Sequence, residues 1–216
     1  MTRILVTHSY YYKFDPKQWR FKQPYPPLGT LIAAAVLRDS GFEVSVFDTN
    51  LIDGASDHFS HELLTTSPQY LVIYDDGFNY LTKMCLTNMR QAAFSMGERA
   101  KRHGCIVIVC SSDATDHYEK YFPHGVDFVV RGEGEETLKE LLQALENKAD
   151  YSSVRGLAFR KGSETIVTSS GPVMKDLDKL PMPAWDLIDI GSYRNIWKKF
   201  HGYFSLNIAT TRGCPF

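Results

Sequence analysis

The chain has 216 residues, of which 44% are hydrophobic and 23% are charged, and its formal net charge is −1. This balance is ordinary for a globular protein and gives no electrostatic argument for binding to nucleic acid or to a membrane. The longest apolar run, residues 28–37, is far shorter than the ~20 residues of a bilayer span. The four cysteines show no disulfide-framework spacing. We therefore expect a cytoplasmic protein with no nucleic-acid or membrane partner.

The first 146 residues alternate between strand and helix patterns. Apolar runs typical of buried parallel strands occur at five places, namely 4–7, 43–48, 70–74, 105–110 and 127–130. Helical spacing of apolar residues follows each strand, in 27–40, 57–66, 81–100 and the leucine-rich stretch after 135 among others. Five such units predict an α/β fold, Rossmann-like (flavodoxin-like), with a five-stranded parallel sheet and helices on both faces.

The pattern changes after residue 148. Residues 154–159 and 165–168 predict a β-hairpin that turns at Lys161-Gly162. Residues 176–189 are punctuated by prolines and predict an irregular linker. A strand-like run at 206–209 then leads into a Gly-Cys-Pro turn.

In an open α/β sheet, ligands bind beyond the carboxyl ends of the strands. The loop after the first strand, residues 8–26, carries seven aromatic side chains and is longer than compact domains usually tolerate without a function. Its rings are equally consistent with one wall of a site for a large flat ligand and with a surface that packs on a neighbouring domain.

Small residues follow the fourth and fifth strands. Ser111 and Ser112 permit close approach of a ligand to the backbone, although Ser112 or Asp113 also suits a helix N-cap. Gly132 and Gly134 permit the same approach, and a plain turn between strand and helix explains them equally well. These patterns by themselves leave both interpretations open.

Four segments together resemble the N-terminal half of cobalamin-binding-domain radical S-adenosylmethionine enzymes. They are 26–50, 125–142 (GVDFVVRGEGEETLKELL), 180–188 (LPMPAWDLI) and 210–216 (TTRGCPF). The resemblance covers essentially the whole chain, and the second and fourth segments are its most specific parts. It implies a Rossmann-like cobalamin domain that precedes a C-terminal radical S-adenosylmethionine barrel.

The resemblance also implies a division of the chain. Residues 1–148 would form the cobalamin-binding domain, 149–175 a hairpin extension, 176–205 a proline-containing linker, and 206–216 the start of an incomplete barrel. Cys214 resembles the first of three thiolate ligands of a 4Fe–4S cluster in a Cys-x-x-x-Cys-x-x-Cys arrangement. The other cysteines, Cys85, Cys105 and Cys110, lie in predicted helices or strands and are interpreted as core.

By position, the resemblance places cobalamin against the loops after the first, third, fourth and fifth strands. The implied cofactor-binding residues are Thr7, His8, Tyr10, Asp76, Gly77, Ser111, Ser112, Gly132 and Glu133. The D-x-H-x-x-G motif that supplies a cobalt ligand in other cobalamin modules is absent from the sequence, so no residue is assigned to cobalt.

The implied parent is an enzyme that uses cobalamin, a 4Fe–4S cluster and S-adenosylmethionine for methyl or related group transfer. The chain alone would bind cofactor and barrel without being catalytically competent. One alternative is the same fold without cobalamin, as a structural or substrate-access domain, because Asp75-Asp76 replaces smaller polar residues. A more distant one is a receiver-like signalling domain, but Thr7-His8 and Arg131 stand where receivers need acidic residues and a lysine.

Overall fold

The computed structural model describes residues 2–52, 55–75 and 85–212, with the backbone only at 55–56. Its centre is a seven-stranded sheet in the order β2-β1-β3-β4-β5-β6-β7. The first five strands pair in parallel, and β6 and β7 continue the sheet antiparallel. The strands are β1 (Arg3–Thr7), β2 (Glu43–Phe47), β3 (Tyr70–Tyr74), β4 (Ile106–Cys110), β5 (Phe128–Val130), β6 (Leu157–Lys161) and β7 (Glu164–Val167).

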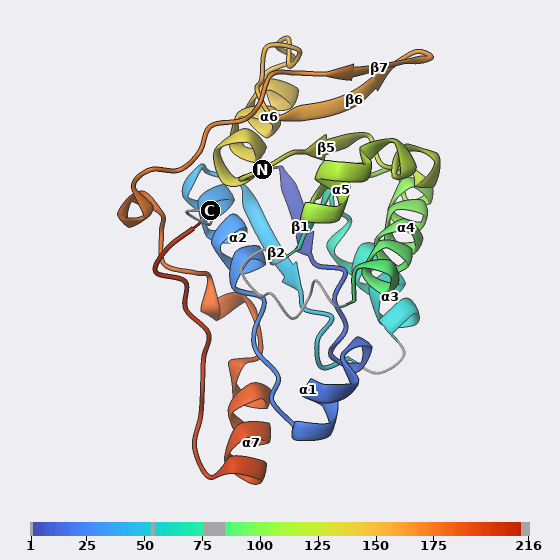
Figure 1. The fold of residues 1–216 in the computed structure, drawn as a ribbon. Coiled ribbons are helices and arrows are strands. Elements are labelled where there is room, and N and C mark those ends of the chain that lie inside the picture. Colours follow the sequence, from blue (N-terminus) through green and yellow to red (C-terminus); the bar gives the residue numbers. More distant parts are fainter. Residues whose placement is uncertain (1, 53–54, 76–84, 213–216) are drawn as a thin grey trace.

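Helices cover both faces of this sheet (Figure 1). The helices α2 and α6 contact each other on one face, and α3, α4 and α5 lie on the other. Two further helices, α1 and α7, lie together at one end of the molecule (Figure 1). The helices are α1 (Pro16–Phe21), α2 (Leu28–Asp39), α3 (Ala55–Thr66), α4 (Leu86–Arg102), α5 (Ser112–His117), α6 (Glu135–Glu146) and α7 (Ile190–His201).

The strands divide their side chains between two hydrophobic clusters. In β1, Ile4 and Val6 pack toward α2 and α6, whereas Leu5 packs toward α3 and α4. This division follows from the two-residue repeat of a strand, which sends successive side chains to opposite faces. Because both faces of β3, β4 and β5 are covered, these strands are apolar without a polar alternation, as the sequence indicated.

The predicted α/β architecture is confirmed, but the sheet is larger than the five strands expected. The hairpin β6–β7 pairs with β5, where Phe128 lies opposite Phe159 and Val130 opposite Leu157. These contacts bury Leu157, Ala158 and Phe159 and cover the edge that β5 would otherwise expose. The hairpin is therefore part of the sheet.

The C-terminal part of the described chain also differs from expectation. Helix α7 lies inside the segment 176–205 that was predicted as a linker, and residues 206–209, predicted as strand-like, are not assigned to a strand. After α7, the chain runs back along the molecule past α2 (Figure 1). Within the described ranges, the helices are all too short or too polar to cross a membrane.

Candidate functional site

The strand order reverses direction between β1 and β3. From β1 the chain moves first outward to β2 and then to the other side to β3. In sheets of this order, the crevice beyond the carboxyl ends at this switch point is where ligands bind. The candidate site is therefore the edge formed by the residues that follow β1, β3, β4 and β5, called here the carboxyl edge.

The end of β1 is turned toward β2. The Thr7 hydroxyl donates to the carbonyl of Phe47 over 2.7 Å, and Nε2 of His8 lies 3.0 Å from Oδ1 of Asp48. Thr7 and His8 are 0% and 1% exposed. The polar groups of both side chains are therefore used within the fold.

Helix α7 closes the same corner. The hydroxyl of Tyr193 donates to the second carboxylate oxygen of Asp48 over 2.5 Å, and the pKa of Tyr193 is raised well above its ordinary value, first by burial and then by Asp48. Thr49 donates to the carbonyl of Tyr10 over 2.6 Å. Burial, with the nearby charge of Asp15, likewise raises the pKa of Tyr10. These contacts hold the start of the aromatic loop against the end of β2.

Asp75 sits at the switch point, directly after β3. It accepts hydrogen bonds from the Ser9 amide over 2.7 Å and from the Ser9 hydroxyl over 2.9 Å. Its own amide donates to the carbonyl of Cys110 over 2.9 Å. Burial raises the pKa of Asp75, and the bonds from Ser9 oppose that shift in part. One carboxylate residue thus joins the ends of β1, β3 and β4.

The end of β4 carries a capped helix and an ion pair. Ser111 is the N-cap of α5, because its hydroxyl accepts from the amide of Ala114 over 2.9 Å, and Ser112 is left exposed. The cap therefore lies one residue before Ser112 and two before Asp113, the positions considered from the sequence. Such a cap fixes the first turn of α5 at the carboxyl edge.

Asp113 is the centre of a small polar network behind this turn. It accepts from Nε of Arg90 over 2.7 Å and from the hydroxyl of Tyr121 over 2.6 Å. Burial raises the pKa of Asp113, but the bonds from Arg90 and Tyr121 outweigh burial and lower it overall. Arg90 was not predicted at this site from the sequence, because it lies on a different helix, 23 residues from its partner.

The turn after β5 leaves open space at one glycine and none at another. Gly132 has a φ of +83°, and a Cβ built there would meet no heavy atom within 4 Å. A Cβ at Gly134 would strike Tyr74 at 2.9 Å. Between them, Glu133 accepts from the amide of Met174 over 2.7 Å. Arg131 lies over the ring of Tyr118, and its buried Nε has no hydrogen-bond partner in the described structure.

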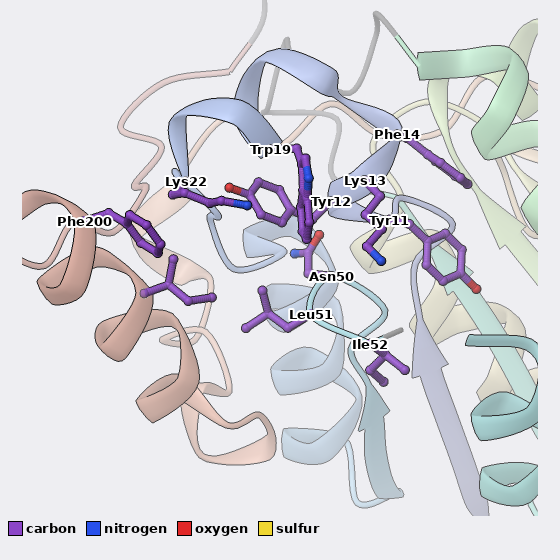
Figure 2. Close-up of a pocket in the computed structure, with 11 residues that line it drawn as sticks. Tyr11, Tyr12, Lys13, Phe14, Trp19, Lys22, Asn50, Leu51, Ile52 and Phe200 are labelled. Carbon is purple, nitrogen blue, oxygen red and sulfur yellow. The ribbon is translucent and has the colours of Figure 1, made fainter. Parts of the chain in front are cut away.

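A pocket of about 380 Å³ lies between the aromatic loop and α7. Figure 2 shows Trp19 and Tyr12 at its centre, with Phe200 contributed by α7. The ammonium of Lys22 lies 3.8 Å from the centroid of the Trp19 ring, a close cation–π contact. The remaining lining residues are Tyr11, Lys13, Phe14, Asn50, Leu51, Ile52 and Ile196. The loop therefore both enters the core, through Tyr10 and Tyr12, and lines this pocket.

The structure places the implied cofactor-binding residues at different depths. Thr7, His8, Tyr10 and Ser111 are buried, whereas Ser112, Gly132 and Glu133 reach the surface of the carboxyl edge. Asp76, Gly77 and Cys214 lie outside the described residues. Cys85, Cys105 and Cys110 are buried, as expected for core cysteines. In the described ranges, no group of three or more His, Cys, Asp or Glu residues is arranged to hold a metal ion.

Curated proteins similar to this chain are known, although no family model matches it. The anaerobic magnesium-protoporphyrin IX monomethyl ester cyclase of Synechocystis sp. is 29% identical over 90% of this chain and 37% of that protein. TokK of Streptomyces tokunonensis, a cobalamin-dependent radical SAM methyltransferase, is 34% identical over 42% of this chain and 13% of its own length. The chain thus spans little more than a third of the first relative and less of the second.

Solved structures share the fold. OxsB, a cobalamin-dependent S-adenosylmethionine radical enzyme with aqua-cobalamin and S-adenosylmethionine bound, matches 99% of this chain and 27% of its own, with a TM-score of 0.67 and 20% identity. TsrM from Kitasatospora setae, a radical S-adenosylmethionine methyltransferase with cobalamin and a [4Fe-4S] cluster bound, matches 84% of this chain and 31% of its own, with a TM-score of 0.61 and 17% identity. At such identities the structural likeness concerns the fold alone. Together with the sequence relatives, it confirms that the chain resembles part of a cobalamin-dependent radical S-adenosylmethionine enzyme.

Proposed function

We propose that this chain is the cobalamin-binding region of a longer radical S-adenosylmethionine enzyme, with cobalamin lying across the carboxyl edge. The observation that carries the proposal is the shared fold, over 99% of the chain, with an enzyme whose structure holds aqua-cobalamin. The strand order supports the same location, because the switch point between β1 and β3 opens onto this edge.

The residues at the carboxyl edge fit a large polar cofactor. Ser112 and Gly132 are exposed and have small or no side chains, which leaves the backbone accessible. The buried Nε of Arg131 adds a donor without a partner in the described structure. We assign ligand contacts to Ser112, Gly132 and Glu133, with Asp76 and Gly77 retained from the sequence. The buried residues Thr7, His8, Tyr10 and Ser111 are assigned to holding the loops in place.

The activity proposed for the parent is methyl or related group transfer. Cys214 would supply the first thiolate of a 4Fe–4S cluster, and a C-terminal barrel would supply the rest of the reaction site. When bound, the cluster, S-adenosylmethionine and cobalamin supply the radical and methyl-transfer chemistry. The domain boundaries at 148, 175 and 205 are part of this proposal, with α7 inside the third segment.

A second candidate is the same module without a bound cofactor. It is favoured by the internal pairing of the polar groups at this edge, since His8 contacts Asp48, Asp75 accepts from Ser9, and Asp113 is paired with Arg90. In that role the domain would support the barrel or the path of its substrate. Cobalamin binding distinguishes the two candidates directly.

The test is to mix the purified chain with hydroxocobalamin and to measure cobalt-corrin absorbance that co-elutes in gel filtration. We expect the wild-type chain to retain the cofactor. Ser112→Tyr places a large ring at the carboxyl edge without entering the core, so affinity should fall at least tenfold. Ser163→Tyr is the matched control, because Ser163 is exposed in the turn between β6 and β7.

Two results would contradict the assignment. Absence of co-eluting absorbance from the folded wild-type chain would favour the module without cofactor. Equal affinity of wild type and Ser112→Tyr for cobalamin would show that the chain binds the cofactor, but not at the carboxyl edge.

A further inference from the structure

The last described residue of the chain makes a buried ion pair with the start of α6. The Arg212 guanidinium donates twice to the carboxylate of Glu135, from Nη2 to Oε1 over 2.6 Å and from Nη1 to Oε2 over 3.1 Å. The two side chains are only 7% and 1% exposed. A carboxylate oxygen of Glu133 lies 3.6 Å from the same guanidinium. A bidentate contact of this kind fixes orientation as well as distance.

The acidic partner stands on the rigid part of the molecule. Glu135 is the first residue of α6, where the helix dipole favours a negative charge. It lies near Tyr74 at the end of β3 and Cys110 at the end of β4, and its charge adds to the burial that raises the pKa of both groups. Arg212 therefore docks where the ends of β3, β4 and β5 meet.

The segment that carries Arg212 is irregular and exposes its large aliphatic side chains. Residues 204–212 are not assigned to any helix or strand. Leu206 and Ile208, which could have anchored the segment by burial, are 40% and 79% exposed. The burial and bonding of Arg212 contrast with this exposure, so the ion pair is a main point of attachment for the segment.

We propose that Arg212 is a positioning residue that anchors the C-terminal segment to the carboxyl edge through Glu135. Cys214, which lies outside the described residues, follows two positions later in the sequence. The anchor thus ties the segment that ends at Arg212 to the edge assigned to cobalamin. Only the identity of the ligand at that edge rests on the proposed function; the anchor stands on the ion pair itself.

The proposal can be tested on the whole 216-residue chain by limited digestion with chymotrypsin, which cleaves after Tyr203, Phe204 and Leu206 in this segment. Replacing Arg212 by Gln should speed cleavage at these sites at least tenfold, and Glu135→Gln should do the same. Cleavage within β3 and β4 should stay slow. Glu136→Gln is the matched control, because Glu136 is the adjacent residue on α6 and pairs with Lys139 instead.

Two further variants separate anchoring from general stability. Arg212→Lys keeps the charge but cannot form the planar double contact, so cleavage of its segment should be intermediate in rate. The double variant Glu135→Gln with Arg212→Gln removes both buried charges. It should unfold at a denaturant concentration close to that of wild type while cleavage of the segment remains fast.

An unchanged rate of cleavage in residues 203–212 of Arg212→Gln would overturn the anchor. So would an increase in Glu136→Gln equal to that in Glu135→Gln. Cobalamin binding is measured separately on the same samples. Its absence from wild type would remove the proposed function without affecting the anchor, and an unchanged cleavage rate would remove the anchor without affecting cobalamin binding.

Discussion

Charged and polar side chains at the carboxyl edge are held by partners from other elements. Asp75 accepts from Ser9, and Asp113 accepts from Arg90 and Tyr121. The pKa values of the two carboxylates are shifted in opposite directions. Burial dominates and raises the pKa of Asp75, whereas hydrogen bonds outweigh burial and lower the pKa of Asp113. Each therefore makes its own pH-dependent contribution to stability.

For Asp75, the direction in which stability changes with pH follows from its raised pKa. Between the ordinary value of about 4 and the raised value, the folded state binds more protons than the unfolded state. The free energy of unfolding contributed by Asp75 therefore falls as pH rises through that interval. Asn has no such titration and can still accept from the Ser9 amide.

We predict that Asp75→Asn gains stability relative to wild type as the pH is raised from about 4 to about 7. Urea denaturation at several pH values measures the difference. Asp116→Asn, at an exposed position on α5, is the control and should follow the wild-type profile. A constant difference between Asp75→Asn and wild type over this range would contradict the prediction.

Among the elements, α7 shows how a helix is stabilised by docking. Its apolar face has only a few large residues, but Tyr193 and Trp197 are each 1% exposed. The indole of Trp197 donates to the carbonyl of Pro24 over 2.7 Å and packs against Tyr25, with ring centroids 5.3 Å apart. Helix α7 therefore holds the far end of the aromatic loop.

Truncating Trp197 should weaken the attachment of α7 to the aromatic loop. Trp197→Ala is expected to lower the free energy of unfolding by about 3–5 kcal/mol and to speed hydrogen exchange in α7 and residues 22–25. Asn195→Ala changes an exposed position of the same helix and should stay within about 0.5 kcal/mol of wild type. Equal losses in the two variants would show that the helix depends on propensity rather than docking.

The signals for α7 were present in the sequence but weak. Asp189 caps the helix by accepting from Ser192, and Gly202 ends it with a φ of +79°. Preceding prolines and the expected barrel favoured a linker instead. The five strands β1 to β5 and the leucine stripe of α6 were predictable, because each depends on the pattern of a short segment.

At the scale of the whole molecule, one sheet supports two hydrophobic layers. Leu141 on α6 is completely buried in one layer, and Leu63 on α3 is 2% exposed in the other. Both layers pack on the same strands, so they should unfold together. The first five strands and the hairpin then behave as one cooperative unit.

Leu141→Ala and Leu63→Ala should each cost about 2–5 kcal/mol. In the double variant the losses should add to within about 0.5 kcal/mol, because the residues lie on opposite faces. Denaturation followed by far-ultraviolet circular dichroism and by tryptophan fluorescence should give one coincident transition. Two separated transitions would mean that the layers fold independently.

The amino-acid order alone was enough to predict the alternation of strands and helices, the parallel α/β class and the resemblance to cobalamin-dependent radical enzymes. These depend on local periodicity and on contiguous motifs. Three features became visible only in the folded chain: the hairpin joins the sheet, His8 turns inward to Asp48, and Arg212 meets Glu135. The last two pairs are 40 and 77 residues apart along the chain. Such contacts depend on how the elements pack, and a pattern read along one segment contains no information about them.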